Sequence, residues 1–226
     1  QELSFVPTDL NDIIKRTVKI CGNTFDKSIE INARYSKKVA ITNADPTQLE
    51  QCLLNLCINA AHAMTLMRKE GEKYGGSLNI SLVPLETGKY FLQLHPEKED
   101  AEDYWVISVQ DNGVGMSPDI VNKIFDPFFT TKTEGKGTGL GLAMAYNIIK
   151  QHEGIIDVYS QEGIGTTFHI YLPALKYQVE EKNPKPRERI HRGEGLILVV
   201  DDEEIMRQTA KSILEECGYR VMLASN

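Results

Sequence analysis

Polar side chains recur along one face of a predicted helix that also has an apolar stripe. In the segment QLEQCLLNLCINAAHAM they are spaced by four, four and three residues, at Gln51, Asn55, Asn59 and His62. This spacing places them on one helix face. Asparagine is unfavourable in helix interiors, so two of them one turn apart need a reason. A carboxamide oxygen is a neutral ligand for Mg²⁺, which keeps water and phosphate oxygens in its other positions. The segment therefore predicts a cation site, with a solvated helix face as the alternative.

The motif DNGVGM, which follows a predicted strand, has residues suited to holding a flat base. The Asp111 carboxylate can accept a hydrogen bond from an exocyclic amine such as that of adenine. Gly113 and Gly115 lack side chains, so a planar ring could approach the backbone there. A tight turn rich in Asp, Asn and Gly is the alternative interpretation.

A glycine-rich loop, GKGTGLGLAMAYNIIKQHEG, runs into a predicted helix. Glycine occupies alternating positions before the helix, at Gly135, Gly137, Gly139 and Gly141. The free N–H groups and the dipole at a helix N-terminus attract phosphate. The loop lacks the Gly-Lys-Ser/Thr ending of a Walker A motif and does not fit the dinucleotide pattern G-x-G-x-x-G after a strand. It therefore predicts a phosphate-binding loop of another kind, or a merely flexible loop.

The nearby sequence IFDPFFTTK places three aromatic rings, Phe125, Phe128 and Phe129, beside two threonines and Lys132. Aromatic residues between a short helix and a glycine-rich segment are consistent with a lid that closes over a ligand. Packing of the same rings in the core is equally consistent with the local sequence.

Helices and strands are predicted to be segregated rather than alternating along the first 173 residues. Helices are predicted from Thr8 or Asp9 to Cys21, from Asp45-Pro46 to Met67, in a short stretch from Ser117-Pro118, and from Gly139 to His152. Strands are predicted at residues 29–35, 39–42, 78–85, 105–110, 155–160 and 166–172. This order predicts an α+β fold in which helices cover one face of a mixed sheet.

The composition changes after residue 173. Residues 174–195 include EEKNPKPRERIHRGEG, which is charged, contains proline and has few apolar side chains, as linkers do. The following LILVVDDEE predicts a buried parallel strand, after which come a helix with Ile205 and Ile213 on one face and a strand at residues 219–223. About 30 residues cannot bury a core alone. Residues 196–226 therefore predict an incomplete β-α-β domain.

Composition narrows the class of protein. A net charge of −7 argues against a nucleic-acid-binding surface, whose footprint is basic. The four cysteines show no CxxC spacing, which indicates buried thiols in a reducing cytoplasm. The strongest apolar run, residues 196–200, is far shorter than a membrane helix, and no signal peptide is visible. We therefore expect a cytoplasmic chain, whose parent protein could be anchored in a membrane upstream.

The motifs are more specific for one family when they are taken together and in order than when each is taken alone. An Asn-x-x-x-Asn helix, Asp-x-Gly-x-Gly, a phenylalanine-rich loop, Gly-Thr-Gly-Leu-Gly and Gly-x-Gly-Thr follow one another along the chain. In this respect the sequence strongly resembles the catalytic ATP-binding domain of sensor histidine kinases, in the superfamily that includes gyrase, Hsp90 and the mismatch-repair clamps. The resemblance covers residues 1–173. It implies a two-layer α/β sandwich of the Bergerat type, with ATP between the helices and a flexible lid.

The resemblance implies a role for each matching residue. Asn59 would bind Mg²⁺, with Asn55 near the phosphates and His62 at a position where many relatives have lysine. Asp111 would hold the adenine amino group, and the rest of the base pocket would comprise Gly113, Gly115, Met116 and Thr166. The triphosphate would be held by Lys132 and by the backbone of Gly137, Thr138, Gly139, Leu140 and Gly141. The catalytic group would thus comprise Asn55, Asn59 and Lys132.

The C-terminal segment carries a second resemblance. ILVVDDEE is similar to the first strand of a response-regulator receiver domain, in which Asp201 and Asp202 would form an acidic pair for Mg²⁺. An acidic helix cap is the alternative. A receiver accepts phosphate on an Asp at the end of its third strand, which this sequence does not reach. We therefore expect a catalytic domain at residues 1–173, a linker at 174–195 and the start of a receiver at 196–226.

Three functions remain: a hybrid histidine kinase, an ATP-hydrolysing clamp and a nucleotide-sensing module. Hydrolytic relatives have a Glu one turn before the metal-binding Asn, where it can activate water. Here that position is Asn55, and Glu50 points away. Phosphoryl transfer needs mainly positioning and charge stabilisation, which favours a kinase.

The acceptor histidine is expected outside this chain. None of the five histidines lies in a His-Glu-x-x-x-Pro pattern, which marks the phosphorylated helix of histidine kinases. The expected partners are therefore the kinase's own dimerisation domain and a receiver in cis or a response regulator in trans. The parent protein is expected to be a homodimer.

Overall fold

The computed structural model describes residues 4–68, 71, 74–85, 103–132, 138–175, 194–200, 207, 210–211, 214–215 and 218–225. Its contacts divide the chain into two compact units, Gln1–Tyr177 and Gln178–Asn226. Most of the predicted linker lies outside the described residues. The same is true of three predicted site residues, Gly137, Asp201 and Asp202.

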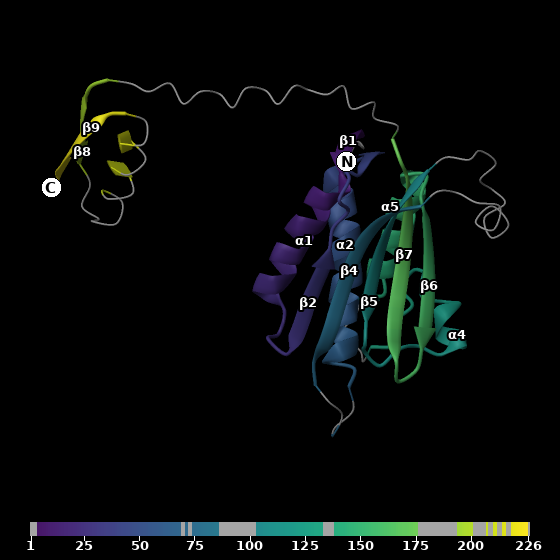
Figure 1. Ribbon diagram of the computed structural model, residues 1–226. Coiled ribbons are helices and arrows are strands. Elements are labelled where there is room, and N and C mark those ends of the chain that lie inside the picture. The colour runs from purple at the N-terminus through teal and green to yellow at the C-terminus, as the bar shows by residue number, and fades with distance from the viewer. Residues whose placement is uncertain are drawn as a thin grey trace. The chain divides into compact units, whose positions relative to one another are not determined.

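The first unit is built on a five-stranded mixed sheet with the order β2-β4-β5-β7-β6 (Figure 1). Its strands are β2 (Ile29–Arg34), β4 (Gly76–Leu85), β5 (Tyr104–Asp111), β6 (Ile155–Gln161) and β7 (Gly165–Pro173). The β2 strand pairs with β4 in parallel, and the other neighbours are antiparallel. A parallel pair needs a long crossover, and here the crossover contains the helix that carries the two asparagines.

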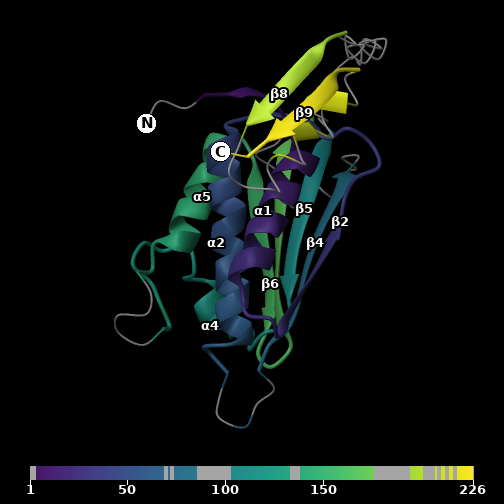
Figure 2. The same ribbon diagram turned by 90° about the vertical axis from the view of Figure 1, so that its left-hand side faces the viewer.

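Three helices, α1 (Leu10–Thr24), α2 (Pro46–Met64) and α5 (Gly141–Gln151), cover one face of this sheet (Figure 2). A single helical turn, α4 (Pro118–Val121), follows β5. Alternate residues of β4, Leu78, Ile80 and Leu82, are buried under the helices, as period-two alternation requires. The predicted two-layer α+β fold is therefore confirmed. None of the described helices has the length and apolar composition of a bilayer span.

A small second sheet was not predicted. It pairs β1 (Val6–Asp9) with β3 (Ile41–Ala44) in antiparallel fashion. The β1 segment has only four residues and includes Pro7, and both features weaken a strand signal. Pairing with β3 and a hydrogen bond from the Thr8 hydroxyl to the Ala44 carbonyl (3.3 Å) supply the order that the local sequence lacks.

The helix starts follow their sequence signals. The Asp9 side chain accepts a hydrogen bond from the Asn11 N–H and caps α1, and Asp45 caps α2, with Pro46 at the first helical position. The apolar stripe of α2 is buried, at Leu49, Leu53, Leu56, Ala60 and Met64. The α2 helix ends three residues before the predicted end, because the Met67 N–H turns back to the His62 carbonyl (3.0 Å).

The helices α2 and α5 lie antiparallel and are hydrogen-bonded at both ends. The Asp45 N–H donates to His152 Nε2 (3.0 Å), and the neutral His152 ring then donates from Nδ1 to the Ile148 carbonyl (2.7 Å). At the other end, Asn55 Nδ2 donates to the Gly141 carbonyl (3.3 Å). The start of α2 is thus fixed to the end of α5, and the two asparagines lie beside the start of α5.

The second unit contains two strands, β8 (Leu196–Val200) and β9 (Arg220–Ala224), which pair in parallel. Between them the described residues 207, 210, 211, 214 and 215 are helical. Both strands agree with the predicted ranges to within one residue. Large apolar side chains remain exposed on both strands, at Leu196, Leu198, Val200 and Met222.

We predict that His152→Leu lowers the free energy of unfolding of the first unit by about 1–3 kcal/mol, because it leaves the Asp45 N–H buried without an acceptor. Denaturant unfolding followed by the fluorescence of Trp105, the one tryptophan of the chain, measures this loss. The control is His169→Leu on the helix-free face of the sheet, where Ser108, the hydrogen-bond partner of His169 (2.8 Å), is only partly buried. Equal losses in the two variants would contradict the prediction.

Candidate functional site

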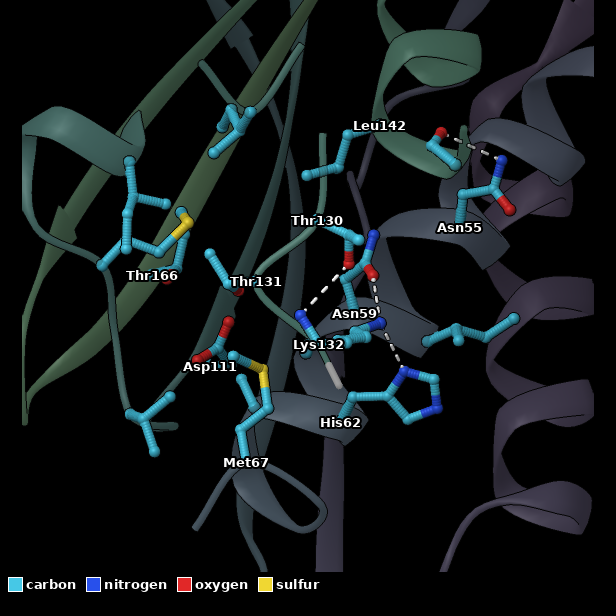
Figure 3. A pocket seen from close by; sticks show the side chains of 18 of the residues that line it. Asn55, Asn59, His62, Met67, Asp111, Thr130, Thr131, Lys132, Leu142 and Thr166 are labelled. Carbon is cyan, nitrogen blue, oxygen red and sulfur yellow. Dashed lines mark hydrogen bonds between the residues drawn. The ribbon is translucent and has the colours of Figure 1, made fainter. Parts of the chain in front are cut away.

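A cavity of about 550 Å³ opens between α2, the start of α5, the ends of β5 and β7, and the segment after α4 (Figure 3). Motifs that are far apart in the sequence meet here. The lining includes most of the predicted site residues, namely Asn55, Asn59, His62, Asp111, Gly115, Met116, Lys132, Thr138, Gly139, Gly141 and Thr166. Two other predicted residues with described positions, Gly113 and Leu140, are not among the lining residues.

The glycines of the DNGVGM motif allow chain segments to approach each other. A side chain at Gly113 would lie 2.6 Å from the Ala63 Cβ of α2. Gly115 has a φ of 66°, and a side chain there would collide with the backbone carbonyl of Gln161. These contacts require glycine at both positions whatever the ligand, and access of a flat ligand to the backbone stays a prediction. Tight packing of the motif between α2 and the β6–β7 turn accounts for both residues.

Asp111 lies at the end of β5 with 7% of its surface exposed. Its Oδ1 accepts a hydrogen bond from the Gly113 N–H (2.8 Å). Burial raises the pKa of the Asp111 carboxyl to about 6, against the opposing effects of the Gly113 and Thr166 N–H groups and of the Arg68 charge. The carboxylate is thus costly to keep ionised in the cavity, and a ligand that donates a hydrogen bond to it would lower that cost.

Around Asp111 the wall of the cavity is apolar. The side chains that form it were mostly not predicted, and they include Met67, Val114, Ile120, Ile124, Phe129 and Phe168. Ile120 and Ile124 are four residues apart, and Phe168 shares a strand face with Thr166. Both spacings are visible in the sequence, but neither shows which apolar face lines a cavity. A few polar groups in an apolar wall are typical of small-molecule sites.

The opposite end of the cavity is polar. The Lys132 Nζ lies 3.1 Å from Asn59 Oδ1 and 2.7 Å from His62 Nδ1 (Figure 3). Burial lowers the pKa of His62, and the nearby Lys132 charge lowers it further. Burial also lowers the pKa of Lys132. Because an ammonium group can only donate, His62 Nδ1 is the acceptor in this contact and the ring is neutral.

The start of α5 lies at the same end, because a side chain at Gly141 would lie 3.9 Å from Asn55 and 4.0 Å from Asn59. No side chain caps this helix, so the N–H groups of its first turn have no side-chain acceptor. Thr138 Oγ1 instead accepts a weak hydrogen bond from the Leu140 N–H (3.4 Å). An uncapped helix N-terminus at a cavity attracts anions such as phosphate.

The three phenylalanines of IFDPFFTTK have three different environments. Phe125 packs against the core with its ring 5.1 Å from that of Tyr146, and Phe129 lines the cavity. Phe128 is 74% exposed and has a φ of 67°, and its N–H donates to the Gly139 carbonyl (3.1 Å). Core packing therefore applies to Phe125 and Phe129, and a lid that closes over a ligand stays a prediction.

The donor set of the cavity fits a magnesium ion that is held mainly by a ligand. Among the described residues there is no group of three or more His, Cys, Asp or Glu side chains able to hold a metal. The Asn59 carboxamide oxygen faces the polar end. Mg²⁺ commonly has one or two protein oxygens and completes its shell with phosphate oxygens and water.

Comparison with known proteins decides the family. The family model described as "Histidine kinase-, DNA gyrase B-, and HSP90-like ATPase" matches residues 44–176, which contain every described residue of the cavity. The chain belongs to this family. The fold and the catalytic-domain resemblance expected from the sequence are thereby confirmed.

Two similar proteins are named as sensor kinases. The sensor kinase CckA of Brucella abortus is 35% identical over 229 residues, covering 96% of this chain and 23% of CckA. The sensor histidine kinase ZraS of Salmonella typhimurium is 37% identical over 178 residues, covering 78% of this chain and 33% of ZraS. The chain thus spans a third or less of these relatives.

Solved structures agree on the fold. The nucleotide-free catalytic domain of the histidine kinase ThkA superposes with a TM-score of 0.57 at 28% identity, covering 76% of this chain and 96% of that one. Full-length ShkA in complex with AMPPNP gives a TM-score of 0.58 at 23% identity, covering 99% of this chain and 41% of that one. At that identity the likeness to ShkA concerns the fold alone.

The raised pKa of Asp111 predicts a pH-dependent cost in stability. The folded domain binds the proton more tightly than the unfolded chain, so the wild type loses stability as the pH rises from about 4 to about 6. The full loss is up to about 3 kcal/mol. Asp111→Asn keeps an acceptor for the Gly113 N–H and removes the titration. Above pH 6 the variant should therefore be more stable than the wild type.

The measurement is denaturant unfolding of both proteins at several values between pH 4 and pH 8. The difference between the two free energies of unfolding isolates Asp111 from the other carboxyls. Two parallel pH profiles would show that Asp111 does not titrate in this window.

Proposed function

We propose that this domain binds Mg–ATP and transfers the γ-phosphoryl group to a histidine on a dimerisation domain outside the chain. The observation that carries this proposal is the polarity of one cavity. A buried carboxyl, Asp111, lies at its apolar end, and Lys132, Asn59 and the uncapped start of α5 lie at the other. ATP has the matching order of groups, a flat base with an exocyclic amine at one end and a triphosphate at the other.

The apolar end suits adenine. The Asp111 carboxylate would accept the hydrogen bond of the exocyclic amine, with Thr166, Met116 and Gly115 beside it. The base would displace water from apolar walls such as Met67 and Phe168, which contributes a hydrophobic stabilisation. A donor facing the buried carboxylate would also offset its desolvation.

The polar end suits the triphosphate. Lys132 would contact phosphate oxygens, and so would the N–H groups at the start of α5, from Thr138 to Gly141 and with the preceding Gly137. Asn59 would supply one oxygen to Mg²⁺. The cation would supply charge stabilisation to the phosphates when bound. Asn55 would position the start of α5 through its hydrogen bond to Gly141.

The lining favours transfer over hydrolysis. Among the described lining residues the sole carboxylate is Asp111, which lies at the base-binding end. One turn before Asn59 stands Asn55, a neutral amide whose Nδ2 is already bonded to Gly141. A carboxylate able to activate water beside the phosphates, as a hydrolytic clamp requires, is therefore absent from the described lining.

The acceptor would be a histidine from another part of the kinase. His152 is buried with both ring nitrogens engaged, and His169 lies on the face of the sheet without helices. His95 and His191 lie outside the described residues. The similarity to CckA and ZraS, which are named as sensor kinases, supports a parent protein with its own dimerisation domain and a response regulator as partner.

We further propose that residues 196–226 begin a receiver domain, with 1–173 as the catalytic domain and 174–195 as the linker. Parallel strands normally occur in sheets covered on both faces, whereas β8 and β9 expose large apolar side chains. Further elements of a β-α-β domain would cover them. The match to CckA covers 96% of the chain and so extends into this unit. Asp201 and Asp202, directly after β8, would then bind Mg²⁺.

Binding measurements should separate the two ends of the site. In titration calorimetry, Asp111→Asn should weaken ADP and ATP alike, by at least about ten-fold, with or without Mg²⁺. Asn59→Ala should weaken only the Mg²⁺-dependent part of ATP binding. The matched control is Asn79→Ala, on the face of the sheet opposite the helices. Near-wild-type affinity in both site variants would refute the assignment.

Incubation with γ-labelled ATP tests the reaction. The chain alone should remain unlabelled, and a separate fragment with the kinase's histidine-bearing helices should acquire acid-labile label. Because the fragments lack the effective concentration of the intact protein, labelling should be slow and proportional to fragment concentration. Acid-stable label on the chain, or rapid phosphate release without acceptor, would point to a different chemistry.

A further inference from the structure

We propose that His62 is a positioning residue that holds Lys132 against α2 and releases it when nucleotide binds. The proposal rests on the function proposed above and assigns a role to a residue that the sequence left without one. His62 in this view positions Lys132 and takes no part in holding the nucleotide.

The arrangement joins two segments across the cavity. Asn59 and His62 are three residues apart on α2 and face the same side. Lys132 reaches them from the segment after α4, and its Nζ lies within hydrogen-bond distance of both, at 3.1 Å and 2.7 Å (Figure 3). The shorter contact is the one to His62. The ammonium group therefore bridges that segment to α2 through two acceptors.

Both acceptors of Lys132 are neutral. Asn59 offers a carboxamide oxygen and His62 the unprotonated nitrogen of a neutral ring. Among the described residues, no carboxylate forms an ion pair with Lys132. A partly buried cation gains more from an anion than from two neutral acceptors. A triphosphate would therefore attract Lys132 away from α2.

The Lys132 ammonium group also competes with Mg²⁺ for the same side-chain oxygen. The proposed Mg²⁺ ligand, Asn59 Oδ1, accepts the hydrogen bond of Lys132 in this structure. Binding of Mg–ATP then requires an exchange, in which Lys132 leaves Asn59 and His62 and moves to phosphate oxygens. A contact that nucleotide binding must break lowers the apparent affinity by its own free energy. Loss of the His62 acceptor should therefore strengthen nucleotide binding.

The test compares His62→Leu with His62→Asn. The leucine variant removes the acceptor, so its Kd for Mg–ATP should fall about five-fold, the worth of one hydrogen bond. The asparagine variant keeps an acceptor, since Oδ1 is the same number of bonds from the backbone as Nδ1, and its Kd should stay near the wild-type value. Unchanged or weaker binding by His62→Leu would overturn the proposal, and weaker binding would indicate that His62 contacts the phosphates itself.

The same substitution in a Lys132→Met chain shows whether the change in nucleotide affinity acts through Lys132. In a Lys132→Met chain, His62→Leu should no longer change the affinity, because the contact is already gone. A persistent five-fold effect would overturn the proposal. The wild-type affinity for Mg–ATP is measured first. Failure of the wild type to bind would refute the proposed nucleotide site, which distinguishes that failure from failure of the His62 assignment.

A spectroscopic measurement needs no variant. In protein with ¹⁵N-labelled histidine, Nδ1 of His62 should appear as an unprotonated nitrogen that accepts a hydrogen bond. Addition of Mg²⁺ with a non-hydrolysable ATP analogue should move this resonance toward that of a free unprotonated nitrogen. A resonance that stays in place while the nucleotide saturates the site would overturn the proposal.

Discussion

The antiparallel alignment of α2 and α5 is the constraint on which the nucleotide cavity depends. His152 bonds the end of α5 to the Asp45 N–H at the start of α2, and Asn55 bonds the start of α5 from the side of α2. In between, the Cys52 thiol lies 3.8 Å from the Ala145 carbonyl. These contacts prevent one helix from sliding along the other. Asn59 on α2 and the N–H groups at Gly141 on α5 therefore keep a constant separation.

The two ends of the cavity contain ionisable groups of opposite charge. At one end Asp111 is buried with backbone donors around it, and burial raises its pKa. At the other end Lys132 has neutral partners, and burial lowers its pKa. Each group is thus less stable in its charged form than it would be in water. A ligand that brings a donor to the carboxyl and an anion to the ammonium group offsets the desolvation of both charges. The free energy that these charges regain then contributes to the affinity for the ligand.

Much of the fold could be predicted because its signals are local. Asp45-Pro46 specifies the start of α2, and its apolar stripe specifies the buried face. Alternation in β7 likewise predicts which side faces the helices. The β1 strand could not be predicted, since its order comes from pairing with β3 across 31 or more intervening residues. The polar residues of the cavity were found through motifs, whereas its apolar walls, such as Met67 and Leu142, have no local signature that distinguishes them from core.

The hydrogen bond between the Phe128 N–H and the Gly139 carbonyl joins two points that are eleven residues apart in the sequence. The bond holds together the two ends of the chain segment between Phe128 and Gly139. A side chain at Gly139 would collide with the Phe128 backbone, so the two ends lie in close contact. Longer loops add little closure entropy once their ends are held. The stretch between Lys132 and Thr138 is therefore a place where this domain can differ in length without loss of its frame. Because Lys132 and Thr138 both line the cavity, a fluorescent reporter inserted between them would be tethered to the cavity wall and make the domain a sensor for its own ligand.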